Sequence, residues 1–175
     1  MQKNGASRRS IRPAALDDFD ELLRLNAQWE HVTSFLDHDA LAHLHASAAY
    51  HRVAEMDSRV VAFLLALAPG ADYESPNYRW FDARSDGFLY IDRVIVDRQY
   101  QRAGLGDALY DDLIAFARSQ GVARLVCEVD IEPHNAASDA FHERRGFVEV
   151  GTQQLEGGKH VSLRELRIVR HAEGG

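Results

Sequence analysis

"VIVDRQYQRAGLGDALYDDL" spans residues 94–113 and joins an apolar run to a helix-like stretch through a polar turn that contains Gly104 and Gly106. The run closes "FLYIDRVIV", residues 88–96, a nearly continuous apolar segment typical of a strand buried on both faces of a sheet. Beyond the glycines, apolar residues recur on one helical face until Gly121: Leu105, Leu109, Leu113, Phe116 and Ala117. A helix start has unpaired N–H groups and a positive dipole end, so this strand–turn–helix predicts a phosphate-binding site.

Two known phosphate-binding designs do not match the turn. A P-loop needs Gly-Lys-Ser/Thr, whereas here Leu105 and Asp107 surround Gly106. A dinucleotide-binding fold needs a third glycine and a tight turn directly after the strand. Leu109 occupies the position of that glycine, and seven residues separate Val96 from Gly104. A dinucleotide oxidoreductase is therefore a distant alternative.

The rest of the chain alternates between strand and helix patterns, which predicts an α/β domain with a mixed sheet. In the first part of the chain we expect a strand ending at Pro13, two helices, from Leu16 and over residues 39–48, and a hairpin of strands 50–56 and 60–68. In the last part we expect strand 124–130, helix 135–145, and two strands within 147–168 around a turn at Gly157–Gly158. The connection 69–87 has no clear periodicity and carries four aromatics, so we expect either a lid or substrate wall, or a loop folded onto the core.

Composition limits the possible partners. Hydrophobic residues make up 46% of the 175-residue chain and the net charge is -7, as in a folded soluble protein without the basic surplus that nucleic-acid binding requires. We expect no nucleic-acid partner, no membrane span, no secretory signal and a cytoplasmic location. Cys127, the single cysteine, lies in an apolar run and is expected to be a buried small hydrophobe. His38, His43 and His45 lack the spacing of a zinc-binding helix face and are expected to be solvated, with no metal bound.

The segment "QRAGLG", residues 101–106, resembles the Gln/Arg-x-x-Gly-x-Gly/Ala signature of the GCN5-related N-acetyltransferases (GNAT superfamily). "CEVDIEPHNAASDAFHERRGF", residues 127–147, resembles the next strand and helix of that family, and the likeness is specific over residues 88–150. The resemblance implies a GNAT-like fold, a central mixed twisted sheet with splayed parallel strands flanked by helices. We expect one acetyltransferase domain over residues 8–170, with flexible termini at 1–7 and 171–175.

The same resemblance implies acetyl-CoA as co-substrate. Backbone groups of the strand would pair with the pantetheine arm, N–H groups of the turn would hold the pyrophosphate, and two residues further along would contact the cofactor. These expected cofactor-binding residues are Val94, Ile95, Val96, Gln101, Arg102, Ala103, Gly104, Leu105, Gly106, Asp107, Asn135 and Ser138.

Acyl transfer to an amine needs a group that removes a proton, because an alkylamine is mostly protonated at pH 7. Glu128 aligns with a position where some members of the family carry a general-base glutamate, and Asp92 and a water chain are the other candidates. The departing thiolate also needs a proton. Many members have a Tyr where this chain has His142, which could donate a proton or only cap the cofactor sulfur.

The resemblance thus implies an N-acyltransferase that moves an acetyl group from acetyl-CoA to an amine of a small molecule or peptide in a ternary complex. A non-catalytic acyl-CoA-binding regulatory protein is the alternative, because the usual Tyr is missing at His142. A homodimer is a further expectation that the late strands would allow.

Overall fold

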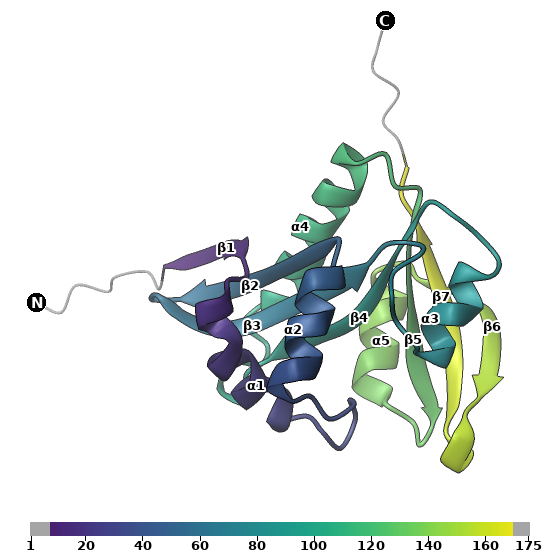
Figure 1. The fold of residues 1–175 in the computed structure, drawn as a ribbon, viewed down its shortest axis with the longest axis horizontal. Helices are drawn as coiled ribbons and strands as arrows, with labels where there is room; N and C mark the ends of the chain where they lie inside the picture. Colours follow the sequence, from purple (N-terminus) through teal and green to yellow (C-terminus); the bar gives the residue numbers. More distant parts are fainter. Residues whose placement is uncertain (1–7, 170–175) are drawn as a thin grey trace, which may run out of the picture. The chain divides into compact units, whose positions relative to one another are not determined.

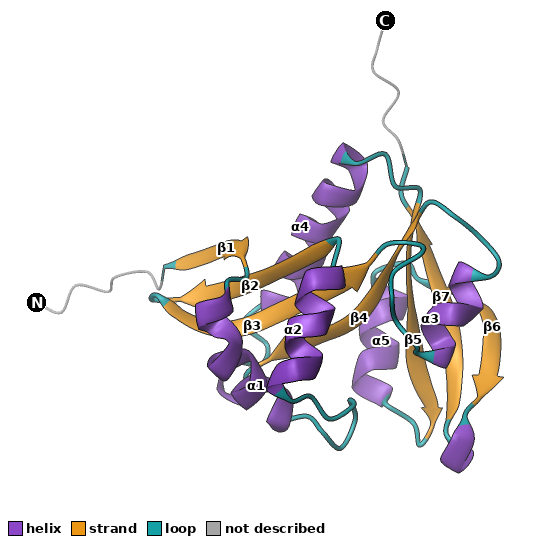
Figure 2. Cartoon of the chain, in the orientation of Figure 1, coloured by secondary structure: helices purple, strands orange, loops and turns teal. Residues whose placement is uncertain are grey.

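Seven strands form a mixed sheet in the order β1-β2-β3-β4-β5-β7-β6 in the computed structural model, which describes residues 8–169 (Figure 1). The strands are β1 (Arg9–Pro13), β2 (Tyr50–Met56), β3 (Arg59–Leu67), β4 (Phe88–Val96), β5 (Arg124–Glu132), β6 (Val148–Gln154) and β7 (His160–Arg167). The helices that flank them are α1 (Phe19–Ala27), α2 (His38–Ser47), α3 (Pro76–Asp82), α4 (Leu105–Ser119) and α5 (Ala136–Arg144), coloured purple in Figure 2. The predicted α/β class with a mixed sheet is confirmed.

The chain divides into two compact units. The first comprises residues 1–65 and 93–112, and the second comprises residues 66–92 and 113–175. β4 and α4 each contribute residues to both units, so a single domain over residues 8–170 stays a prediction. The expected flexible ends lie outside the described residues. Within residues 8–169 every helix falls short of the length and apolar content that crossing a membrane demands.

In the first unit, α1 and α2 pack side by side (Figure 1). α1 buries Phe19, Leu22 and Leu25, which share one helical face. The predicted start at Leu16 is three residues early, because residues 16–18 form a 3-10 turn and Leu16 is exposed. α2 begins one residue earlier than predicted, with the Asp37 carboxylate accepting the Ala40 N–H at 2.8 Å as a helix cap.

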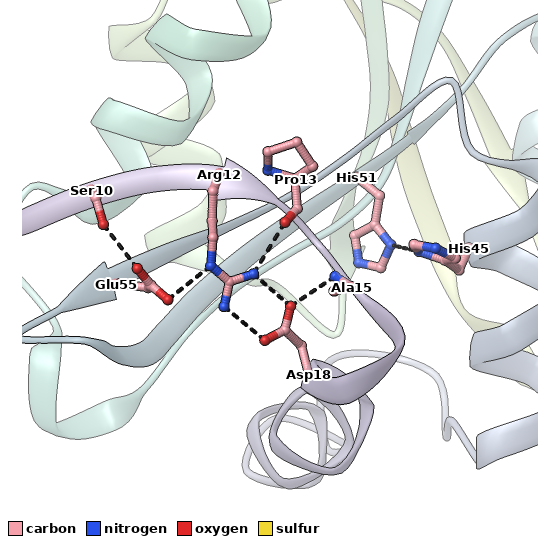
Figure 3. Close-up of polar contacts among 8 residues, drawn as sticks. All are labelled: Ser10, Arg12, Pro13, Ala15, Asp18, His45, His51 and Glu55. Atoms are coloured by element: carbon pink, nitrogen blue, oxygen red, sulfur yellow. Dashed lines mark hydrogen bonds and ion pairs between the residues drawn. The ribbon is translucent and has the colours of Figure 1, made fainter.

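An arginine fork joins β1 to the start of α1. The Arg12 guanidinium donates to both carboxylate oxygens of Asp18, at 2.7 and 2.8 Å, and to Glu55 of β2 at 2.8 Å (Figure 3). Asp18 also accepts the Ala15 N–H at 2.8 Å. Bidentate geometry makes this the stronger kind of ion pair, and it holds the pKa of Asp18 below its usual value, mainly through the bond from Arg12.

A histidine pair lies beside this fork. The Nδ1 atoms of His45 in α2 and His51 in β2 are 2.8 Å apart, so one ring donates to the other (Figure 3). The expectation of three solvated histidines is wrong for His45, which is half-buried by this contact and by Phe19, while His38 and His43 are exposed. The His51 Nε2 atom is buried and has no hydrogen-bond partner among residues 8–169.

Stability should therefore fall in mild acid. Burial is the main cause that lowers the pKa of His51 to about 4, from 6.5. As the pH falls from 6.5 toward 4, the unfolded chain gains a proton at His51 that the folded chain does not, so the free energy of unfolding decreases. His51→Phe is expected to remove about 2 kcal/mol of the decrease between pH 7 and pH 5, measured by urea unfolding.

The exposed His43→Gln variant is the control for that experiment and should keep the wild-type pH dependence. An unchanged pH dependence in His51→Phe would mean that other groups, such as buried His142, cause the decrease.

In the second unit, β7 lies between β5 and β6 and is antiparallel to both. The predicted turn between β6 and β7 is confirmed, with positive φ angles of 82° and 83° at Gly157 and Gly158. α5 is capped by the Asn135 side chain, which accepts the Ser138 N–H at 3.2 Å, and Gly146 follows it with φ 88°.

α3 lies in the connection 69–87, where no helix was predicted. Ser75 caps the Tyr78 N–H with its side chain, and Pro76 occupies the first turn, where a missing N–H carries no penalty. Tyr78 and Phe81 are buried against Phe88 and Tyr90. The sequence pattern allows either a lid or substrate wall, or a loop folded onto the core. Through its buried residues, α3 agrees with the second of these.

Candidate active site

The glycine turn at the start of α4 has the backbone of an anion-binding loop. Gly104 has φ 73°, and residues 101–104 are exposed, whereas Leu105 is buried and anchors the helix. The first helical bond beyond the turn runs from the Ala108 N–H to the Gly104 carbonyl, at 3.0 Å. The N–H groups of Leu105 and Gly106 precede this bond, so they belong to the helix-start donors that can bind a phosphate.

The end of β4 leads into this turn with alternating burial. Ile95 is buried, and Val94 and Val96 are half-buried. The Val96 carbonyl accepts the Trp29 indole N–H at 2.9 Å, so one of the peptide groups expected to pair with pantetheine already has a partner. The Asp97 N–H donates to the Val61 carbonyl at 2.8 Å, which fixes where the turn begins.

In the second unit, β4 and β5 run parallel over a short ladder. The ladder covers three residue pairs, from Phe88 with Arg124 to Tyr90 with Val126. Asp92 and Glu128 each lie two residues beyond its last pair, on the same face of their strands as Tyr90 and Val126. Both carboxylates are half-buried.

Glu128 is held by hydrogen bonds from two neighbours. Tyr90, which is buried, donates its hydroxyl to Glu128 Oε2 at 2.7 Å, and Asn77 of α3 forms a second hydrogen bond to the carboxylate. Burial is the main cause that raises the pKa of Glu128 to about 7. The bonds from Tyr90 and Asn77 oppose this rise, and the charge of Asp92 adds to it. A carboxylate with a pKa near neutrality is suited to accept a proton.

Asp92, the other candidate acid, accepts a short hydrogen bond from the Tyr73 hydroxyl. Tyr73 lies in the connection before α3, and its ring contacts Tyr78 and Tyr90. Asp130, on β5 two residues after Glu128, is ion-paired with Lys159 at 3.0 Å. Glu128 is the acid of this face that a buried tyrosine holds by a hydrogen bond, and its raised pKa suits a base at neutral pH.

His142, Asn135 and Ser138 come together at α5. His142 Nδ1 lies 2.7 Å from the Ser138 carbonyl, which can only accept, so Nδ1 carries the proton. The ring is buried, and burial is the main cause that lowers its pKa below 6.5. A neutral ring whose proton is bound to a carbonyl does not favour the predicted donor role. Asn135 uses its side chain to cap α5.

Sequence reasoning missed three residues around the two acids: Tyr73, Asn77 and Tyr90. Tyr90 interrupts the apolar run of β4 two residues before Asp92, a spacing that places both on one face. Asn77 follows Ser75-Pro76, a helix-start signal that could have revealed α3. Cys127 is buried as predicted. No cluster of three or more His, Cys, Asp or Glu able to hold a metal ion occurs within residues 8–169.

The first unit contains a strand end and a glycine turn with helix-start N–H groups, and the second contains a carboxylate with a raised pKa. Both features are among those expected of an acyltransferase. The family model of the acetyltransferase (GNAT) family matches residues 13–147, and the chain belongs to this family.

Named relatives match parts of the chain. Phosphinothricin N-acetyltransferase from Streptomyces viridochromogenes is 29% identical over 101 residues, 58% of this chain and 52% of the relative. The [ribosomal protein bS18]-alanine N-acetyltransferase from Escherichia coli is 46% identical over 56 residues, 32% of this chain and 36% of the relative. The chain thus matches about half of the first relative's length and about a third of the second's.

Solved structures share the fold along nearly the whole chain. The ribosomal-protein-S18-alanine N-acetyltransferase from Escherichia coli has a TM-score of 0.71 at 21% identity, covering 95% of this chain and 97% of its own. The structure of yncA from Salmonella typhimurium with its cofactor acetyl-CoA also has a TM-score of 0.71 at 21% identity, covering 97% and 99%. The GNAT-like fold is confirmed.

Proposed function

We propose that this protein is an N-acyltransferase that moves an acetyl group from acetyl-CoA to an amine of a small molecule or peptide. The observation that carries the proposal is Glu128, a half-buried carboxylate with a pKa raised to about 7 beside the β4 strand of a GNAT family member. Burying an ionised carboxylate costs free energy, and carboxylates with shifted pKa values are concentrated at functional sites. The role of a base at neutral pH would explain why Glu128 is buried.

The proposed reaction is direct transfer in a ternary complex. The amine gives its ammonium proton to solvent and attacks the thioester carbonyl carbon in its neutral form. A C–N bond forms, the C–S bond breaks and the nitrogen loses one further proton. Glu128 accepts that proton and later returns it to solvent. General-base assistance of this kind contributes about 10²- to 10⁴-fold to the rate.

The departing thiolate takes one proton to become a thiol. The thiolate of a thiol with an ordinary pKa, about 8.5, can take this proton from water near neutral pH, so the reaction balances without a dedicated acid. We assign His142 to the support of α5 instead, because its Nδ1 proton is bound to the Ser138 carbonyl.

The turn before α4 is the proposed pyrophosphate site. The family resemblance assigns it the backbone N–H groups from Arg102 to Asp107. The Ala103 N–H already donates to the Tyr100 carbonyl at 3.3 Å, so the N–H groups of Leu105 and Gly106, at the helix start, are the main proposed donors. The exposed turn at Gly104 supports this proposal because it lets a phosphate approach the backbone.

Melting-temperature titrations with acetyl-CoA and NADH, followed by a thiol-release assay over a panel of amines, test the function. We expect acetyl-CoA alone to raise the melting temperature and at least one amine to release thiol in step with an acetylated product seen by mass spectrometry. The panel should contain small amines and peptides with an N-terminal alanine, since the names of the two relatives cover both kinds of acceptor.

Stabilisation by acetyl-CoA without thiol release from any amine would instead support the non-catalytic alternative. Stabilisation by NADH alone would overturn the proposal. A cytoplasmic location and a homodimer stay predictions, which fractionation and light scattering can test.

A further inference from the structure

Two elements, β4 and α3, bring polar groups to the Glu128 carboxylate. Tyr90 and Asp92 face it from β4, and Asn77 faces it from α3. On the opposite strand β7, its paired residue is apolar Leu163, and on its own strand the buried Cys127 thiol feels its charge. Two of these groups donate hydrogen bonds to the carboxylate, and one brings a like charge.

Tyr90 is fixed as a donor. Its side chain is buried, and burial raises its pKa well above the usual value, so the hydroxyl keeps its proton throughout the neutral range. The ring contacts Tyr73, Tyr78 and Phe81, which leaves the hydroxyl little freedom to leave Glu128 Oε2, 2.7 Å away.

Asn77 is oriented by a third element. Gln153 of β6 donates its amide N–H to Asn77 Oδ1 at 3.3 Å, so the Asn77 amide nitrogen is the atom left to donate to the Glu128 carboxylate. α3 also contacts β6 through Trp80, whose ring lies close to the Gly151 backbone. The Glu128 carboxylate thus accepts hydrogen bonds from two elements, from Tyr90 of β4 and from Asn77 of α3.

We propose that Tyr90 and Asn77 are positioning residues that hold the Glu128 carboxylate in place and keep it ionised at neutral pH, against the opposing charge of Asp92. The proposal rests on the proposed function, because it gives the role of base to Glu128. It gives α3, which lies in the connection expected to be either a lid or substrate wall or a loop folded onto the core, the role of holding Glu128 through Asn77.

The geometry predicts opposite effects for two substitutions. Tyr90→Phe removes a bond to the ionised form, so the acid limb of the kcat/KM profile should move to higher pH by about one unit. Activity at pH 7 should then be about fivefold lower and should recover at pH 9. Asp92→Asn removes a like charge, so the limb should move to lower pH. If these residues only stabilised the fold, the two substitutions would not shift the acid limb of the kcat/KM profile in opposite directions.

Tyr50→Phe is the matched control, since buried Tyr50 also donates its hydroxyl to a carboxylate, Asp112, at 2.7 Å. It should lose stability without moving the limb. A limb that stays in place in Tyr90→Phe, or moves equally in Tyr50→Phe, would overturn the proposal. If Tyr90→Phe does not fold, Asn77→Ala should move the limb in the same upward direction, and a limb that does not move there would also overturn it.

A readout that needs no turnover separates this inference from the proposed function. The ¹³C shift of the Glu128 carboxyl, assigned with Glu128→Gln, should titrate near pH 7 and move upward in Tyr90→Phe. That shift in a protein that acetylates no amine would refute the function while supporting the positioning role. Turnover combined with an unshifted titration would refute the positioning role alone.

Discussion

Replacing Glu128 by glutamine should lower kcat/KM for acetyl transfer at pH 8 by about 10²- to 10⁴-fold, the usual contribution of a general base. Glutamine keeps the shape of the side chain and an oxygen that can accept from Tyr90, but it cannot take the proton of the amine. The measurement is thiol release with the best amine of the panel, with acetyl-CoA affinity expected to stay at the wild-type value.

This loss of activity should not come from a loss of stability. Because the folded state raises the pKa of Glu128, the folded protein favours a neutral side chain there, and stability falls as the pH rises from 4.5 through 7. Glu128→Gln should therefore melt at the same or a higher temperature than wild type at pH 8.

Asp130→Asn is the control on the same strand, because Asp130 forms an ion pair with Lys159 and is not assigned a step in the proposed reaction. It should keep activity within a few-fold of wild type. Equal losses in Glu128→Gln and Asp130→Asn would contradict the assignment of the base.

Gly104→Ala should weaken acetyl-CoA binding by about tenfold. At φ 73° an alanine is strained by roughly 1–2 kcal/mol, and relaxing this strain would rearrange the turn that presents the helix-start N–H groups. The Cβ itself would meet only the end of the Arg9 side chain at 3.7 Å, an ordinary contact, so crowding within the protein is not the cause. Calorimetric titration with acetyl-CoA measures the effect.

Gly87→Ala is the matched control, because Gly87 has φ 70° and open space around its Cβ position. Both variants should lose similar stability, and only Gly104→Ala should lose affinity. Equal affinity in the two variants would mean that the turn before α4 does not hold the cofactor.

Local patterns predicted the elements that depend on local backbone chemistry. The glycine turn and the helix after it were predicted from spacing alone, since a positive φ angle and a helical apolar face are properties of neighbouring residues. The hairpin of β2 and β3 and the cap of α5 at Asn135 were also predictable, for the same reason. The position of Glu128 on a buried strand followed from the apolar run around it.

Contacts between distant residues could not be predicted in this way. Tyr90 and Glu128 are 38 positions apart, and no spacing rule shows which of several tyrosines will meet the carboxylate. His45 was expected to be solvated because its contact with His51 depends on how α2 packs, which helix periodicity does not reveal. α3 is seven residues long and too short to show a periodic face, so only its Ser-Pro start marked it.

The pH dependence of kcat/KM in wild type and Glu128→Gln, with one acceptor amine, tests the central claim most directly. With Glu128 as base, wild-type activity should fall about tenfold per unit below pH 7, and the residual activity of Glu128→Gln should lack that acid limb. The same limb in both proteins would contradict the claim and assign the proton transfer to another group.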